Sequence, residues 1–159
     1  MEGVSASASL IFWLKQSFLI LVATCLLVQP ILGTVVKYCD KKGDYGVEVQ
    51  GVEIFPNPVV SGKPATFNIS GSTGQAISGG KVVIDVSYFS IHVHTEIHDL
   101  CEEISCPVAV GSFVLSHTQT LPAFTPPGSY TLKMTMRDDK DEMLTCVSFN
   151  FKIGFGNCL

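Results

Sequence analysis

The chain has 159 residues, six cysteines and a formal net charge of −4 at pH 7. This length suits one domain. The 10 Lys and Arg residues are outnumbered by 14 Asp and Glu residues, so the sequence lacks the basic surface that nucleic-acid binding requires. We therefore expect a single domain that has no nucleic-acid partner.

Residues 1–33 have the layout of a secretory signal peptide. Lys15 lies before an apolar run at residues 18–28, and Pro30 and Gly33 follow that run. A basic flank, a short apolar core and small or turn residues at a cleavage point are typical of such a leader. A retained membrane anchor is the alternative, but a membrane span needs about 20 continuous apolar residues. Because Lys15 and Gln16 interrupt the run, the sequence favours cleavage near Gly33.

The predicted domain then covers residues 34–159. Removing residues 1–33 takes away Lys15 and Glu2, so 9 Lys and Arg and 13 Asp and Glu remain and the net charge stays at −4. The domain keeps five of the six cysteines: Cys39, Cys101, Cys106, Cys146 and Cys158. In a secreted chain this odd number predicts two disulfides and one spare thiol. The sequon Asn68-Ile69-Ser70 predicts N-glycosylation of Asn68.

Turn residues break a period-two alternation of apolar and polar residues about every ten positions, which predicts an all-β fold. The strands that we expect cover residues 46–55, 64–70, 81–89, 91–97, 111–121, 130–137 and 144–153. The number and spacing of these strands favour an immunoglobulin-like two-sheet β-sandwich.

The last two expected strands show which side chains should form the core. One face of the hairpin carries only apolar and aromatic residues, and the intervening positions are polar or charged. The apolar residues are Tyr130, Leu132, Met134, Met136, Val147, Phe149, Phe151 and Ile153.

The stretch "IHVHTEIHDLCEEISCP", residues 91–107, is the densest group of chemically versatile side chains. On a strand, alternate residues share a face. One face would carry His92, His94, Glu96 and His98, and the other would carry Ile91, Val93, Thr95 and Ile97. Imidazole and carboxylate groups can bind zinc. However, there is no H-E-x-x-H helix and no second ligand pair at zinc spacing. We therefore expect no metal site, histidines that face solvent, and an apolar face that lines the interior.

Three further features of the sequence have ordinary explanations. In a secreted chain, the spacing Cys101-x4-Cys106 favours a disulfide over a zinc knuckle. Asp99, Glu102 and Glu103 are expected in a solvated loop, because a calcium site would need more oxygen ligands. The pair Ser116-His117 has no G-x-S-x-G elbow around it, so both residues are expected at the surface. We predict that the protein is not an enzyme and needs no cofactor; a zinc-dependent enzyme remains the alternative that metal analysis would exclude.

Four motifs, in this order, resemble the ML lipid-recognition family. They are "YCDKKGD", "FNIS", "CEEISCPV" and "MRDDKDEMLTCVSF", and together with their spacing they cover residues 35–155. The segment "HVHTEIHDLCEE" is similar to plant members. The family includes the Niemann–Pick type C secreted sterol carrier and phosphatidylglycerol/phosphatidylinositol transfer proteins. Two stretches depart from the sterol carrier: "FPNPVVSGKP" lacks its early cysteine pair, and "SIHVHTEIH" replaces its proline-rich pocket rim.

The resemblance implies a sandwich with an apolar cavity between its sheets, and the disulfides Cys39–Cys146 and Cys101–Cys106. It further implies a secreted, vacuolar or lysosomal protein that carries a sterol or a phospholipid (phosphatidylglycerol or phosphatidylinositol). The expected partners are this lipid, a membrane surface in transient contact, and a membrane receptor or acceptor protein. The alternative function is a lipid-sensing co-receptor or adhesion module without transfer activity.

The pocket that we expect combines residues of several strands and of the loop after residue 121. Ile91 and Val93 would form its rim or wall, Phe124 and Pro126 the opposite lip, and the Cys101–Cys106 loop would fix the shape of the rim. The full set is Ile54, Phe67, Ile69, Phe89, Ile91, Val93, Leu121, Phe124, Pro126, Tyr130, Leu132, Met134 and Phe149.

Overall fold

The computed structural model of the protein describes residues 33–41 and 43–155. The predicted signal peptide up to residue 32 and Cys158 therefore lie outside the described residues. The strands are β1 (Val36–Tyr38), β2 (Val47–Phe55), β3 (Val59–Val60), β4 (Pro64–Thr73), β5 (Gly80–Tyr88), β6 (Ile91–Asp99), β7 (Gly111–Thr120), β8 (Gly128–Asp138) and β9 (Met143–Gly154). A short helix, α2 (Leu100–Glu103), follows β6.

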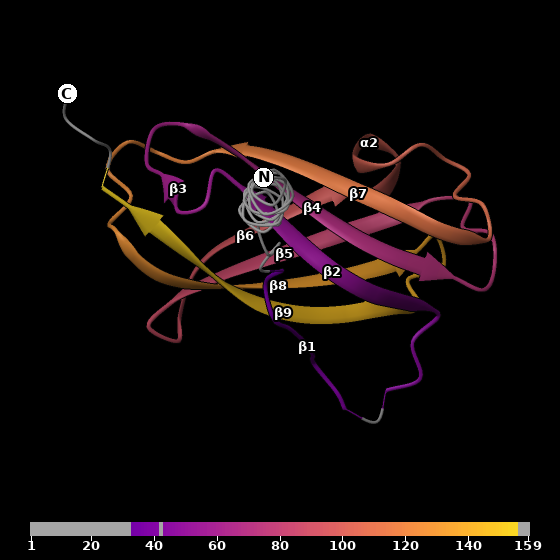
Figure 1. Cartoon of the computed structure of the whole chain (residues 1–159). Coiled ribbons are helices and arrows are strands. Elements are labelled where there is room, and N and C mark those ends of the chain that lie inside the picture. Colours follow the sequence, from indigo (N-terminus) through magenta and orange to yellow (C-terminus); the bar gives the residue numbers. More distant parts are fainter. Residues whose placement is uncertain (1–32, 42, 156–159) are drawn as a thin grey trace, which may run out of the picture. The chain divides into compact units, whose positions relative to one another are not determined.

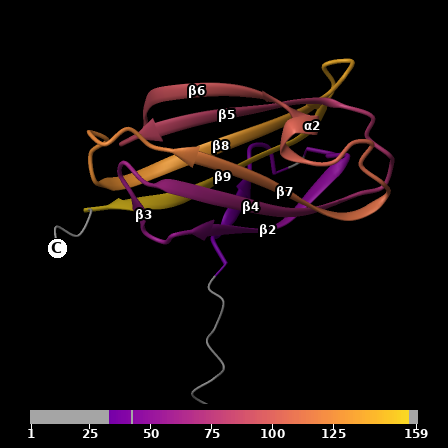
Figure 2. The same ribbon diagram turned by 90° about the horizontal axis from the view of Figure 1, so that it is seen from above.

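The strands form two sheets that face each other (Figures 1 and 2). The larger sheet has the order β1-β9-β8-β5-β6, with β3 parallel to the end of β9. The smaller sheet has the order β2-β4-β7. The prediction of an all-β, two-sheet sandwich is therefore confirmed, and all seven expected strands are present. Sequence alternation did not reveal β1, β3 or α2, because elements of two to four residues are too short to show a period.

Apolar side chains from both sheets fill the space between them. In β8 and β9 these are the residues that the alternation predicted, from Tyr130 to Ile153, and each is at most 6% exposed. The smaller sheet contributes Val52, Ala65, Phe67, Ile69 and Leu115. Phe67 meets Phe151 edge to face, with ring centroids 5.5 Å apart, so aromatic side chains fill the centre of the interface.

The two long edges of the sandwich are closed in different ways. At one edge β1 of the larger sheet reaches β2 of the smaller sheet: the Val49 amide donates to the Tyr38 hydroxyl at 2.8 Å, and the Thr34 amide donates to the Val52 carbonyl at 3.2 Å. At the other edge β6 lies near β7, and the side chains that meet there are polar. This second edge contains the histidine stretch.

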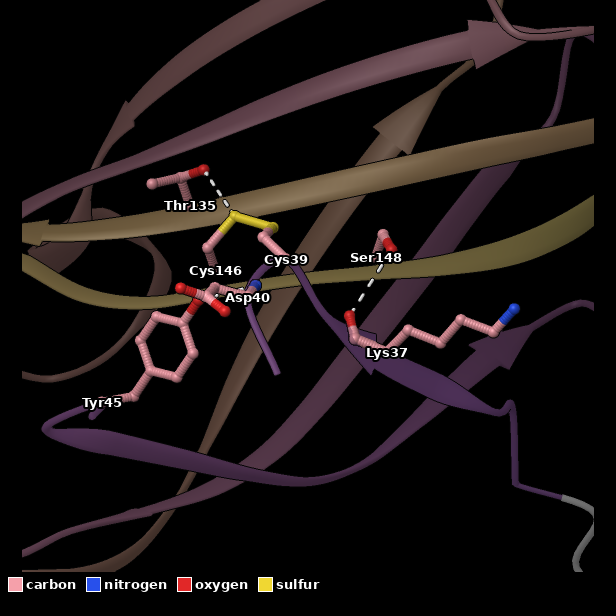
Figure 3. The surroundings of a disulfide bond; sticks show 7 residues. All are labelled: Lys37, Cys39, Asp40, Tyr45, Thr135, Cys146 and Ser148. Atoms are coloured by element: carbon pink, nitrogen blue, oxygen red, sulfur yellow. Dashed lines mark hydrogen bonds between the residues drawn. A yellow bond between two sulfur atoms is a disulfide. The ribbon is translucent and has the colours of Figure 1, made fainter. Parts of the chain in front are cut away.

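The structure contains both disulfides that the family resemblance implied. Cys39–Cys146 joins the end of β1 to β9 across a sequence separation of 107 residues (Figure 3). The Cys39 amide donates to the Cys146 carbonyl at 2.9 Å. The Thr135 hydroxyl contacts Cys146 Sγ at 3.5 Å. Cys101–Cys106 closes a loop with a separation of only 5 residues around α2.

The loops gather at two opposite ends of the sandwich. The β5–β6 turn and the β7–β8 loop lie at one end, where the Tyr88 hydroxyl donates to the Pro127 carbonyl at 3.3 Å. We call this the aromatic end. The α2 loop lies at the other end, because nine residues of β6 separate it from the β5–β6 turn (Figure 2).

Candidate functional site

Eight of the predicted pocket residues pack between the two sheets. They are fully or partly buried against the common core: Ile54, Phe67, Ile69, Leu121, Tyr130, Leu132, Met134 and Phe149. Sequence analysis missed inner-face residues of β5 and β7, including Val82, Ile84, Tyr88 and Leu115, and missed Phe151 of β9 as a pocket residue. The alternation in β5 and β7 could have identified them, because the same pattern identified β8 and β9.

Three stacked or edge-on ring contacts lead from the core to the aromatic end. Phe151 lies 5.6 Å from Tyr130, and Tyr130 lies 4.6 Å from Tyr88, both in stacked arrangements. Tyr88 meets Phe89 edge-on at 4.4 Å. The Tyr130 hydroxyl donates to the Pro126 carbonyl at 2.8 Å. A continuous row of rings therefore connects the buried interface to the surface at this end.

Burial perturbs the phenol of Tyr130. Loss of solvent raises its pKa above the ordinary value of 10.0, and the nearby Tyr88 phenol raises it further. Because the protonated hydroxyl donates to the Pro126 carbonyl, this side chain also fixes the β7–β8 loop over the core.

The aromatic end exposes large apolar side chains. Phe124 is 88% exposed, Phe89 74% and Ile91 69%. Pro126 is also exposed. Phe124 and Pro126 belong to the β7–β8 loop, Phe89 to the β5–β6 turn, and Ile91 begins β6 directly after that turn. The structure therefore brings the two predicted lips to the same end of the sandwich.

The β5–β6 turn has an unusual sequence for its backbone. Phe89 and Ser90 have φ angles of +47° and +64°, which are the left-handed values of a two-residue type I′ hairpin turn. Asn-Gly is the preferred pair at such positions, and a bulky residue at positive φ is a strained outlier. Phe89 is nevertheless held there, exposed and packed edge-on against Tyr88.

The prediction for the faces of β6 is wrong for the apolar face and for His98, whereas His92 and His94 face solvent as predicted, with side chains 60% and 58% exposed. Val86 pairs with His94 and Ser87 pairs with His92, so the register shifts and Val93 lies at a bulge. Val93 is 51% exposed and Ile97 66% exposed, so they do not line the interior. The alternation separated the two faces of the strand but could not show which face pointed inward.

The inward face of β6 belongs to a polar edge cluster of Glu96, His98, Glu103 and His117. Glu96 and His98 come from β6, Glu103 from α2 and His117 from β7. These side chains are between 7% and 26% exposed. Glu96 can point inward because His117 and Gln119 of β7, together with His98 of its own strand, satisfy its carboxylate. Such partners are the condition for burying a charged group.

Both histidine rings lie between the two carboxylates. His98 Nε2 lies 3.0 Å from Glu96 Oε2, and His98 Nδ1 lies 3.5 Å from Glu103 Oε1. His117 repeats the arrangement, with Nε2 3.8 Å from Glu96 Oε2 and Nδ1 3.0 Å from Glu103 Oε1. The ring centroids are 4.7 Å apart.

Glu96 is held on its other side as well. Its Oε1 accepts a hydrogen bond from Gln119 Nε2 at 2.7 Å and lies 2.7 Å from His94 Nε2. Burial acts to raise the pKa of Glu96, but the hydrogen bonds with His94 and His98 outweigh it and lower the pKa below its ordinary value. Glu96 is therefore ionised at neutral pH.

The surface predictions for two further residues of this cluster are wrong. Glu103 was expected in a solvated loop, and its side chain is only 10% exposed. His117 was expected at the surface with Ser116, and it is 6% exposed. Ser116 lies on the opposite face of β7, where its hydroxyl donates to Asn68 Oδ1 at 2.8 Å, so the two residues do not form a catalytic pair. The alternation of His117 with buried Leu115 was the signal for its inward position.

The disulfide loop Cys101–Cys106 is not at the rim that Phe124 and Pro126 would form. It lies at the end opposite to the aromatic end, beside an open hollow of about 520 Å³ between α2 and the start of β7. A second hollow, of about 600 Å³, lies between the segments at Tyr45 and Gln75. Neither hollow is lined by a residue of the predicted pocket.

The fold and the apolar inner faces define an immunoglobulin-like sandwich of the kind that the sequence motifs predicted. The ML domain family model matches residues 33–153, and this chain therefore belongs to the ML domain family. Within the described residues, no helix has the length and apolar character that a membrane crossing requires.

Curated relatives align with most of this chain. A Dictyostelium discoideum protein, provisionally named a phosphatidylglycerol/phosphatidylinositol transfer protein, is 28% identical over 84% of this chain and 95% of its own length. The phosphatidylglycerol/phosphatidylinositol transfer protein of Aspergillus oryzae is 32% identical over 70% of this chain and 67% of its own length.

Solved structures share the fold. A Niemann–Pick type C2 protein from the Japanese carpenter ant has a TM-score of 0.61 at 17% identity, over 76% of this chain and 99% of that chain. Chicken MD-1 in complex with lipid IVa has a TM-score of 0.52 at 18% identity, over 74% of this chain and 86% of that chain.

Proposed function

We propose that this protein binds a single phospholipid or sterol between its two sheets and transfers it between membranes in a lumenal or extracellular compartment. The observation that carries the proposal is the apolar interior of an ML-family sandwich, connected by a row of aromatic rings to exposed apolar side chains at one end. The names of the relatives make phosphatidylglycerol and phosphatidylinositol the first ligands to test.

The interior supplies the affinity in this mechanism. Burying about 300 Å² of apolar ligand surface at about 25 cal/mol per Å² contributes about 7 kcal/mol before the costs of association. That balance gives reversible binding, which suits a carrier. The centre of the interface is filled by Phe67 and Phe151, so a lipid tail must displace these rings or part the sheets. No bond is made or broken in this function.

The aromatic end supplies the contact with the membrane. Phe89, Ile91 and Phe124 are the exposed apolar residues there, and aromatic side chains with apolar bodies insert well at a membrane surface. A lipid tail could then pass from the bilayer along Tyr88 and Tyr130 without crossing water. Exposed apolar groups of this kind commonly mark an interaction site.

The disulfides support a lumenal or extracellular compartment. Disulfides such as Cys39–Cys146 and Cys101–Cys106 persist in oxidising compartments. The side chain of Asn68 lies on the outer face of β4, away from the interior, so a glycan there would not block lipid binding. A loss of mass after treatment of the secreted protein with a peptide N-glycosidase, absent in Asn68→Gln, tests this modification.

A lipid-sensing or adhesion module without transfer activity is the second candidate. The packed ring pair of Phe67 and Phe151 favours the adhesion form of this candidate, because an ordinary filled core needs no ligand. In that case membrane receptors would bind the protein, and lipid would not move.

Lipid analysis by mass spectrometry of protein purified from its host separates the two candidates. The carrier proposal expects about one lipid per chain, and expects the protein to accelerate movement of fluorescent phosphatidylglycerol, phosphatidylinositol or sterol between vesicles. Absence of both co-purified lipid and transfer overturns it. Co-purified lipid without transfer favours the sensing module.

A further inference from the structure

The polar edge cluster has the donor set of a metal site. Ligand atoms of Glu96, His98 and His117 lie within 4.8 Å of one another, and they come from the edges of both sheets. The sequence predicts no metal site because no second ligand pair follows β6 at the spacing of a zinc motif. The fold supplies the missing ligand from β7, 19 positions after His98 in the sequence.

Two donor–donor distances bracket the separation expected around one ion, and all three donors lie within 4.8 Å of one another. In tetrahedral zinc sites the donors lie about 2.0–2.2 Å from the metal, which places them about 3.4 Å from each other. Glu96 Oε2 lies 3.0 Å from His98 Nε2 and 3.8 Å from His117 Nε2, on either side of that value. Small side-chain movements would therefore place all three atoms around a common centre.

Glu103 completes the arrangement from the other side of the rings. Its Oε1 lies 3.0 Å from His117 Nδ1 and 3.5 Å from His98 Nδ1. Metal-binding histidines usually donate their second ring N–H to a carboxylate, which fixes the tautomer and frees the other nitrogen for the metal. Here one carboxylate can accept from both histidines, and both free nitrogens then face Glu96.

Gln119 and His94 orient the carboxylate ligand in the same way. Both contact Glu96 Oε1 at 2.7 Å, so Oε2 is the oxygen left to bind an ion. The cluster thus has three ligands and further side chains that orient them: Glu103 contacts both histidines, and Gln119 and His94 contact Glu96.

The charges of the cluster also call for a cation. Glu96 and Glu103 are 18% and 10% exposed, and buried carboxylates need a compensating charge. In the described part of the chain, no lysine or arginine forms an ion pair with either of them; histidines are their partners. One divalent ion beside Glu96 would supply such a charge.

We propose that Glu96, His98 and His117 bind a divalent transition metal ion, best matched by zinc, that fastens the edge of β6 to the edge of β7. Two imidazoles and one carboxylate suit zinc rather than calcium or magnesium, which prefer oxygen ligands alone. Glu103 acts as a positioning residue through the two rings. The ion closes the long edge opposite to the β1–β2 contacts, and this role does not depend on lipid transfer.

Zinc titration of untagged protein, produced from the full chain and dialysed against a chelator and then metal-free buffer, tests the site. We expect one Zn²⁺ per chain by calorimetry, and a rise in the thermal unfolding midpoint on adding zinc. Cobalt should replace zinc and give the intense visible absorption of tetrahedral coordination. Absence of stoichiometric zinc binding overturns the proposal, and so does cobalt bound only with the weak spectrum of an octahedral surface complex.

Variants locate the ion within the chain. Glu103→Gln should weaken zinc binding by about 10- to 100-fold, the range for groups that hold metal ligands, and His98→Gln should weaken it further still. His92→Gln is the matched control, because His92 lies in the same strand but contacts Thr95 and Asp85 outside the cluster. Equal zinc affinity in His98→Gln and His92→Gln would place any bound ion elsewhere and overturn the assignment. The cobalt spectrum is measured on the unaltered protein and needs no variant. The proposal can therefore still be tested if one of the variants fails to fold.

Discussion

Phe67 of β4 and Phe151 of β9 meet edge to face across the two sheets, with ring centroids 5.5 Å apart. They are 4% and 6% exposed, so each ring is part of the packed interior. An edge-to-face pair of this kind contributes about 0.5–1.5 kcal/mol beyond the burial of its area. The pair therefore stabilises the sandwich at the place where a lipid tail would have to lie.

Replacing Phe67 with alanine should destabilise the lipid-free protein by about 3–5 kcal/mol, because it removes a buried ring and leaves a cavity. Denaturant unfolding measures this loss. If a lipid tail occupies the same space, saturating phosphatidylglycerol should restore part of the lost stability. Phe55→Ala is the matched control: Phe55 is 77% exposed on the neighbouring strand β2, and its loss should change stability by less than about 0.5 kcal/mol. Equal effects of the two substitutions would contradict this account of the interface.

The two disulfides should differ in their contribution to stability. Loop-closure entropy grows with the length of the closed loop, and the sequence separations are 107 residues for Cys39–Cys146 and 5 for Cys101–Cys106. Replacing both cysteines of the first pair with serine should lower the free energy of unfolding by up to about 4.7 kcal/mol, and of the second pair by about 2 kcal/mol. Chemical denaturation of the two double variants tests the order. A larger loss for the short loop would show that its main role is to position α2, where Cys101 Sγ lies 3.9 Å from the Ser78 carbonyl oxygen.

The alternation in β8 and β9 predicted their inner faces because these strands lie inside the larger sheet, where one face is buried and the other polar. Strand β6 is an edge strand with chemically mixed faces, and its own sequence does not settle its orientation. Two residues that follow β6 in the sequence decide it: His117 contacts Glu96, and Glu103 contacts His98. These contacts form only in the folded chain, so the sequence of β6 alone cannot show which of its faces points inward.

The sequence could place the two predicted lips of the pocket at one end of the sandwich. It could not show that the Cys101–Cys106 loop, predicted at the same rim, lies elsewhere. The aromatic and proline residues around Phe124 and Phe89 mark loops, and consecutive antiparallel strands bring these loops to one end. The loop Cys101–Cys106 follows β6 directly, and nine residues of extended strand carry it to the opposite end. Strand connectivity therefore separates two features that the sequence analysis had placed together.

Stability should fall at alkaline pH through Tyr130. Burial raises its pKa above 10.0 in the folded protein, so the folded state holds this proton more tightly than the unfolded state. This contribution is fully present below the ordinary pKa and is lost as the pH rises through the raised pKa. Denaturant unfolding between pH 8 and pH 11.5 should show the decline.

Tyr130→Phe isolates this effect. The variant should be less stable at neutral pH by about 0.5–1.5 kcal/mol, because it loses the hydrogen bond to the Pro126 carbonyl. Its stability should nevertheless depend less on pH above 10. Tyr45→Phe removes a phenol at the opposite end of the sandwich and should keep the decline of the unaltered protein. If the stability of Tyr130→Phe falls above pH 10 as much as that of the unaltered protein, another titrating group causes the fall.

For the strained β5–β6 turn we predict that a change that stabilises the folded protein also slows lipid transfer. Phe89 and Ser90 hold positive φ angles that cost about 1–3 kcal/mol each in residues other than glycine, and strain of this size is commonly retained where it serves a function. The double change Phe89→Asn with Ser90→Gly gives the turn its preferred pair and should raise the free energy of unfolding. It also removes a ring that is 74% exposed at the aromatic end. If that ring inserts into the bilayer, the more stable variant should bind phosphatidylglycerol vesicles less and transfer lipid more slowly.

Ser90→Gly alone separates the two effects, because it relieves strain and keeps the ring. This variant should be stabilised and should transfer lipid at the rate of the unaltered protein. Vesicle co-sedimentation and fluorescent lipid transfer, measured beside denaturant unfolding, give both quantities on each variant. Transfer that stays unchanged in the double variant would show that Phe89 has no part in membrane contact, and the exposed ring of Phe124 would then be the residue to test. Transfer that falls equally in Ser90→Gly would assign the effect to the backbone of the turn, since that change leaves every aromatic side chain in place.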